Sequence, residues 1–217
     1  WGWQIDGHHL ALNVVVIGDQ LLYTPTFMGS EPCKIDSGPL AGIDLFRPEE
    51  HSGLALMKSL DVAQAKTATL YTSIHPHDIP VSLQDPVDGR MQAGAFKDNA
   101  VLPYEGVCAD AMSDAQRALL RDVIGSFTSW GRDGHASVKM AEVDAHLDET
   151  WFAWMGAQGD DGPFYYRLQS PVVLIELDHH PGIVFDNTIP SRNHVHSILT
   201  KLKLQNRTQL VGMTTKQ

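Results

Sequence analysis

The order of strand-like and helix-like segments along the chain constrains the fold most. Residues 10–17 are aliphatic and β-branched, Gly18-Asp19 provides a turn, and residues 20–24 return, which predicts a β-hairpin. Residues 25–42 are rich in Gly, Pro and Ser and are expected to form a loop. Helical patterns follow, and strand-like runs return in the last third. This order predicts an α+β fold with a mainly antiparallel sheet from an N-terminal hairpin and C-terminal strands, with helices inserted between them.

Capping signals locate the expected helices. A proline and two glutamates in residues 47–50 are typical of a first helical turn. Asp61 is expected to cap a second short helix, and Ser113 with Gln116 forms a capping box before a third. A fourth helix is expected over residues 138–147.

The remaining segments are one long irregular stretch and four short strands. Residues 75–104 carry many prolines and glycines, which predicts a surface excursion of the kind that often serves as a lid or binding loop. The expected strands are residues 152–155, 164–169, 172–178 and 194–199.

Composition narrows the class of protein. A chain of 217 residues fits one domain. Its net charge of -10 repels phosphate backbones and argues against a nucleic-acid partner. No tract reaches the ~20 apolar residues of a membrane helix, so a membrane-spanning protein is excluded. The chain begins with Trp1 rather than Met, which leaves room upstream for a secretory peptide and favours a secreted or periplasmic location.

The C-terminal strands hold the strongest chemical signal. Because strand side chains alternate, His194 and His196 place two imidazoles on one face with Cα atoms about 6.6 Å apart. Glu176 and Asp178 share a face of the preceding strand, and buried carboxylates require a cation, an ion pair or water. If these strands pair, Glu176, His194 and His196 form a ligand set for a divalent ion: Fe, Mn, Zn or Cu. A metal-free polar pocket and structural hydrogen bonding are the alternatives.

A second histidine pair lies near the N-terminus. Alternation from residue 8 onward places His9 on a polar face with Asn13, and His8 among leucines. We therefore expect His9 to be a fourth metal ligand or a donor that supports the ligands. His8 is either a core histidine or a further functional group, and we count it among the catalytic candidates.

Arg167 and Asp178 complete the catalytic candidates. Arg167 follows two tyrosines on an expected strand, where it either binds an anionic substrate bidentately or neutralises Glu176 or Asp178. His179 and His180 precede a Pro-Gly pair, which predicts an exposed turn.

An ordered series of motifs spans most of the chain. The motifs are Trp1-Gly2-Trp3, Gly7-His8-His9-Leu10 with Asn13, Thr24-Pro25-Thr26-Phe27, Ala115-Gln116-Arg117, Trp151-Phe152-Ala153-Trp154, Phe164-Tyr165-Tyr166-Arg167, Leu174-Ile175-Glu176 and His194-Val195-His196-Ser197. With them the chain resembles the family catalogued as domain of unknown function 3500. The resemblance implies a further helical segment before the first residue. We therefore expect residues 1–217 to be a single domain that is incomplete at its N-terminus and atypical after about residue 199.

Together these residues predict a metal-dependent enzyme, an oxidoreductase rather than a hydrolase. It would act on a small molecule, which Arg167 would orient if that molecule is anionic. The alternative is a non-enzymatic protein whose residues hold a ligand or a structural metal with a closed coordination sphere. A metal-free enzyme in which Glu176 and His194 exchange protons is the third possibility.

Overall fold

The computed structural model describes residues 1–97, 100–182, 186 and 188–200. Its strands are β1 (Gly2–Asp6), β2 (Leu10–Ile17), β3 (Gln20–Leu22), β4 (Thr26–Ser30), β5 (Thr69–Tyr71), β6 (Val107–Cys108), β7 (Trp151–Gly156), β8 (Phe164–Gln169), β9 (Leu174–His179) and β10 (Val195–Thr200). Its α-helices are α1 (Arg47–Ser59), α2 (Val62–Ala68), α3 (Asp114–Thr128) and α4 (Asp133–Ala145). The atypical ending expected after about residue 199 lies almost wholly outside the described residues.

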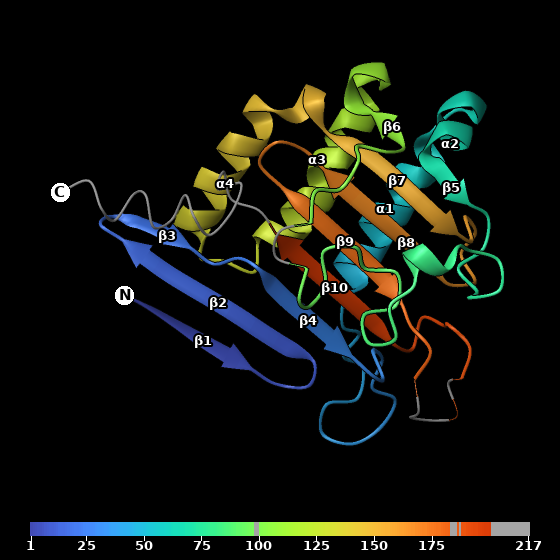
Figure 1. Ribbon diagram of the computed structural model, residues 1–217, viewed down its shortest axis with the longest axis horizontal. Helices are drawn as coiled ribbons and strands as arrows, with labels where there is room; N and C mark the ends of the chain where they lie inside the picture. The colour runs from blue at the N-terminus through green and yellow to red at the C-terminus, as the bar shows by residue number, and fades with distance from the viewer. Residues whose placement is uncertain (98–99, 183–185, 187, 201–217) are drawn as a thin grey trace.

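All ten described strands belong to one sheet with the order β1-β2-β4-β10-β9-β8-β7-β5, in which β3 pairs with β2 and β6 with β7. Only β5 and β7 are parallel among the described pairs. Figure 1 shows the helices against one face of this sheet and irregular chain across the other. The α+β class, the N-terminal hairpin, the C-terminal strands and the helices between them are therefore confirmed.

The hairpin turn has the backbone that its sequence predicts. β2 and β3 pair directly on either side of it, and Gly18 has a φ of 61°, which glycine adopts without steric penalty. β1 lies on the other side of β2 and forms the edge of the sheet.

The expected loop over residues 25–42 is wrong for its first part, because β4 forms there. Local composition favours a loop, but β4 pairs with β2 on one side and β10 on the other. Long-range pairing of this kind overrides local preference in strands. β4 joins the hairpin to the C-terminal strands and so brings the segment before β2 close to β10.

The predicted helix starts are confirmed at three positions. α1 carries its proline and glutamates in the first turn, and Asp61 and Ser113 cap α2 and α3 through complete capping boxes. α4 starts at Asp133, before the expected residue 138. None of the described helices is long and apolar enough to cross a membrane.

The two faces of the central strands differ in chemistry. Ile175 and Leu177 belong to the apolar core with residues of α1 and α3. Glu176 and Asp178 point to the opposite face and contact the long connection between β5 and β6, residues 72–106. The predicted alternation in this strand is therefore confirmed, and the irregular excursion covers the polar face.

Candidate metal centre

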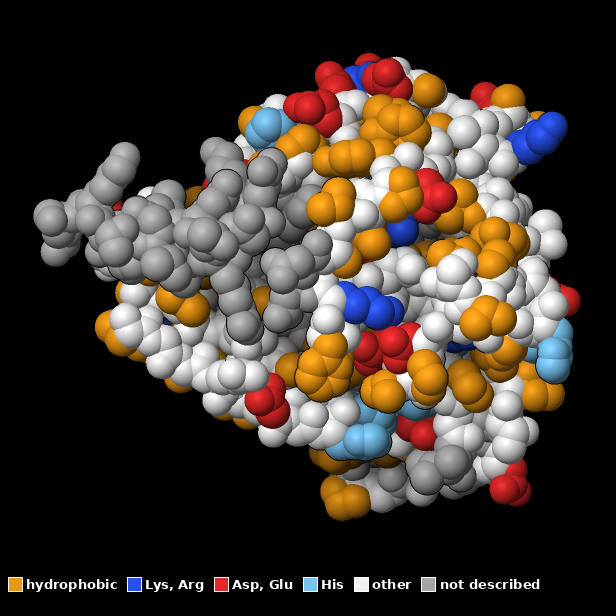
Figure 2. All heavy atoms as spheres, viewed as in Figure 1, with side chains coloured by type: hydrophobic (Ala, Val, Ile, Leu, Met, Phe, Trp, Pro, Cys, Tyr) orange, Lys and Arg blue, Asp and Glu red, His pale blue; other side chains and the backbone are white. Residues whose placement is uncertain are grey.

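Five histidine rings from separate segments gather on the polar side of the sheet. His8 and His9 precede β2, His180 follows β9, and His194 and His196 lie just before and within β10. Neighbouring rings have centroids 4.0–5.5 Å apart. Figure 2 shows histidine side chains beside acidic side chains on this face. The pairing of β4 with β2 and β10 is what brings these segments together.

Three of these histidines have the geometry of a metal site. Each of His9, His194 and His196 offers a ligand atom, and these atoms lie within 4.8 Å of one another. Nε2 of His9 lies 3.2 Å from Nε2 of His194. Two nitrogens bound to one tetrahedral zinc ion are separated by about 3.3 Å. The same distance also suits an N–H···N hydrogen bond between the two rings. The surroundings of His196 therefore decide between a metal site and a simple hydrogen bond.

His196 carries two buried nitrogens without a hydrogen-bond partner. The residue exposes 7% of its surface, and neither Nδ1 nor Nε2 has a partner among the described residues. A buried polar group without a partner is costly. A metal ion bound to one of these nitrogens would supply the missing interaction, so the donor set fits a metal ion.

The tautomer of His194 also suits metal binding. Its Nδ1 lies 2.9 Å from the carbonyl oxygen of Pro181. A carbonyl oxygen only accepts, so Nδ1 carries the proton and Nε2 presents a lone pair toward His9. Glu31 lies behind this ring, with Oε2 3.8 Å from Nδ1. Such partners orient a ligand histidine from the side opposite the metal.

Burial keeps these imidazoles neutral. It lowers the pKa of His9 and of His194, with smaller contributions from neighbouring histidines. Burial, His180 and His194 together lower the pKa of His196 to about 2. Neutral imidazole is the form that binds metals.

Gly29 provides the room for two of the rings. It lies opposite His196 in the β4–β10 ladder. A Cβ at this position would lie 2.8 Å from Cδ2 of His196 and 3.4 Å from Cδ2 of His9. This glycine was not singled out in the sequence, where nothing distinguishes it from a loop glycine.

The register of β9 and β10 places the predicted carboxylate away from the triad. The two strands pair as expected, but Glu176 lies opposite Ile198, and Asp178 lies opposite His196. The structure therefore brings His9, His194 and His196 together but does not include Glu176 in that group.

Glu176 is instead held by the excursion. Its oxygens accept hydrogen bonds from the backbone N–H groups of Gln92 (2.7 Å) and Ala93 (2.8 Å) and from the hydroxyl of Tyr165. Burial raises the pKa of Glu176, although these donors favour the carboxylate. This arrangement satisfies both oxygens without a metal.

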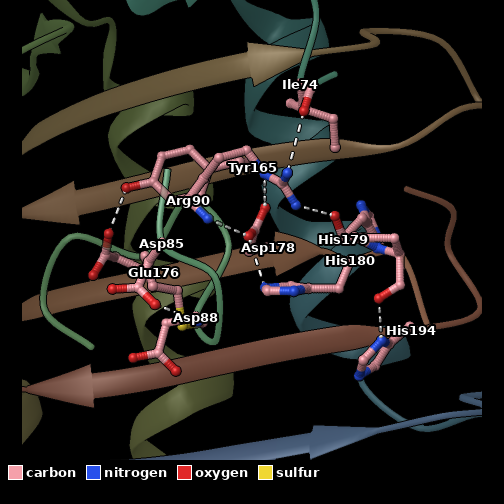
Figure 3. Close-up of polar contacts among 12 residues, drawn as sticks. Ile74, Asp85, Asp88, Arg90, Tyr165, Glu176, Asp178, His179, His180 and His194 are labelled. Carbon is pink, nitrogen blue, oxygen red and sulfur yellow. Dashed lines mark hydrogen bonds and ion pairs between the residues drawn. The ribbon is translucent and has the colours of Figure 1, made fainter. Parts of the chain in front are cut away.

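Asp178 lies in a buried ion pair with Arg90 (Figure 3). Nε of Arg90 donates to Oδ1 at 2.6 Å, and its backbone N–H donates to Oδ2 at 2.9 Å. Nε2 of His180 lies 2.9 Å from the same Oδ2. Burial alone would raise the pKa of Asp178, but Arg90 and His180 outweigh it and hold this pKa well below its usual range. Arg90 was not anticipated, since only long-range folding brings it to β9.

Arg167 is also engaged within the protein. Its guanidinium donates to a carboxylate oxygen of Glu105 at 2.7 Å and to the carbonyl of Pro103 at 3.1 Å. The structure shows Arg167 in an ion pair, which was one of its two expected roles. Its partner is Glu105 rather than Glu176 or Asp178.

The expectations for the two histidine pairs need correction. His8 and His9 lie in the connection before β2, where strand alternation does not apply, and their rings are 4.4 Å apart. His179 and His180 are buried rather than exposed, because β9 includes His179 and the backbone N–H of His180 still bonds to the carbonyl of His194.

Comparison with known protein families identifies the family of this chain. The pattern of the family described as Protein of unknown function (DUF3500) matches residues 1–205. The chain therefore belongs to this family, as its motifs predict. No curated protein and no solved structure matches the chain.

Proposed function

We propose that this chain is a metal-dependent enzyme whose divalent ion is held by His9, His194 and His196. The observation that carries the proposal is His196, which is buried with both ring nitrogens lacking a partner among the described residues. Folding a polar ring into such a position is unfavourable unless a ligand compensates. The facing lone pair of His194 supplies a second donor at a suitable separation.

Three protein ligands leave a coordination position for a substrate or water, as in catalytic rather than structural metal sites. Sites built from imidazole bind Cu(II) more tightly than the other divalent first-row ions. We therefore favour oxidoreductase chemistry with copper, and zinc-dependent hydrolysis is the alternative that the same three imidazoles would support. When bound, a redox ion would supply electron transfer, whereas zinc would lower the pKa of bound water to about 7.

The surrounding residues support a small substrate. His194 and His196 are buried and His9 is partly exposed, so a ligand would reach the ion from the side of His9. His8, exposed and in ring contact with His9, is our candidate for proton transfer to that ligand. Arg167 already pairs with Glu105, so the proposal does not depend on an anionic substrate.

Copper titration of the purified chain tests this function. We expect Cu(II) to bind the wild type and to bind His196→Ala more than about 100-fold more weakly, because loss of a ligand should exceed the effect of losing a supporting residue. Azide added to the copper-loaded wild type should change its electron paramagnetic resonance spectrum by occupying the open position. Binding without an azide effect would favour the structural-metal alternative, and no binding of Cu(II), Zn(II), Fe(II) or Mn(II) would refute a metal centre.

A further inference from the structure

We propose that His180, held by Asp178 and Arg90, is a positioning residue that fixes the orientation of the His196 ring for metal binding. This inference rests on the proposed function and deepens it. It concerns a residue outside the triad of ligand atoms and assigns a role to the buried ion pair on β9.

The need for such a residue follows from the lack of hydrogen bonds to His196. A ligand histidine is usually oriented by a carboxylate or carbonyl that accepts from its second ring nitrogen. His194 has such a partner in Pro181, but His196 has none among the described residues. Its orientation must therefore be set by packing.

Besides the proposed ligands His9 and His194, two further rings pack against His196. The His180 ring lies at a centroid distance of 4.0 Å with an interplanar angle of 34°, which is a close, tilted ring contact. Phe27 contacts His196 edge-on, at 5.0 Å and 79°. The imidazole thus lies between Phe27 on β4 and His180 at the end of β9.

His180 can serve this purpose because it is itself held. Nε2 of its ring lies 2.9 Å from Oδ2 of Asp178. The side chain and backbone N–H of Arg90 hold the two Asp178 oxygens in turn. Gly89 packs directly against His180, since an added Cβ there would overlap Cε1 of that ring. Figure 3 shows His180 beside Asp178, with Arg90 on the other side of the carboxylate.

This arrangement connects residues 89–90 of the excursion to the metal ligands through a series of direct contacts. Loss of His180 should leave all three proposed ligands in place but allow the His196 ring to rotate. Supporting residues of this kind usually change metal affinity by about 10- to 100-fold.

Copper affinity and the copper spectrum of His180→Ala and His180→Phe test the proposal. We expect His180→Ala to weaken Cu(II) binding by about 10- to 100-fold and to change the resonance spectrum at saturating copper. His180→Phe retains a ring against His196 and should recover part of the affinity. His135→Ala removes an exposed histidine on α4 and should match the wild type.

The outcomes separate this inference from the proposed function. Wild-type protein that binds no metal would refute the metal centre itself. Copper binding that is lost in His196→Ala but unchanged in affinity and spectrum in His180→Ala would refute the role of His180 alone. A thermal melt of each metal-free variant shows whether it is folded. If His180→Ala does not fold, His180→Phe decides: an affinity closer to that of the wild type than to that of His196→Ala would support packing, and a loss as large as that in His196→Ala would refute it.

Discussion

Replacement of Arg90 by Met should destabilise the protein strongly, because it leaves Asp178 buried without its main partner. The side chains of Arg90 and Asp178 expose only 3% and 0% of their surfaces. Removal of one member of a buried ion pair costs about 3–5 kcal/mol. Arg90 also donates to the carbonyls of Ile74 and His179, which lose these donors in the variant. We therefore expect a loss of about 4 kcal/mol at pH 7.

Urea unfolding followed by tryptophan fluorescence measures this loss. With an m-value of about 3 kcal/mol/M, the midpoint should fall by roughly 1.3 M. Arg121→Met is the matched control, because its ion pair with Asp144 has side chains that are 47% and 44% exposed. That variant should lose less than about 1 kcal/mol. Equal, small losses in both variants would refute the reasoning that the Arg90 pair is buried and structurally important.

The pH dependence of the stability lost in Arg90→Met is a second test of this ion pair. In the wild type the pKa of Asp178 is depressed, so its stabilisation is present above the unfolded value of about 3.9 and is lost only at lower pH. Without the Arg90 side chain, burial of Asp178, the largest single effect on its pKa, is opposed mainly by His180, so the protonated carboxyl becomes more favourable than in the wild type. The stability deficit of the variant relative to the wild type should therefore shrink as the pH is lowered from 7 toward 5. Arg121→Met should show no such change.

Two further variants probe the excursion. Glu176→Gln should lose about 1–3 kcal/mol in urea unfolding, because an amide nitrogen replaces an acceptor of a buried backbone N–H. Its copper affinity in calorimetry should equal that of the wild type; a large loss would instead return Glu176 to the ligand set. Gly89→Ala should lower both stability and copper affinity, since the added methyl group overlaps His180. Gly18 has a similar φ but open space around it, so Gly18→Ala should lower stability without changing copper affinity. Equal changes in copper affinity in the two alanine variants would contradict a contact between Gly89 and His180.

Local patterns predicted much of the fold. The period-two alternation around Glu176 identified the polar face of β9, because strand geometry depends only on adjacent residues. Asp61 and Ser113 marked helix starts because a capping box involves only residues three positions apart. β4 was missed because its pairing partners lie far away in the sequence.

The site could be predicted only in part, because its assembly depends on register and tertiary contacts. The H-x-H pattern indicated His194 and His196, and His9 was expected beside them. The pairing of Asp178 rather than Glu176 with His196 depends on strand register, which the pattern of polar residues alone did not specify. Arg90 had no local signal, since its partner is on a distant strand.

The metal content of the purified chain tests the central claim most directly. Wild-type protein, His194→Ala/His196→Ala and the control His77→Ala/His135→Ala, which removes two exposed histidines, would each be incubated with Cu(II), Zn(II), Fe(II) or Mn(II). After desalting, inductively coupled plasma mass spectrometry gives the metal-to-protein ratio. We predict a ratio near one for at least one metal in the wild type and control, and near zero in the folded ligand variant. Equal retention in all three proteins, or none in the wild type, would contradict a metal centre at His9, His194 and His196.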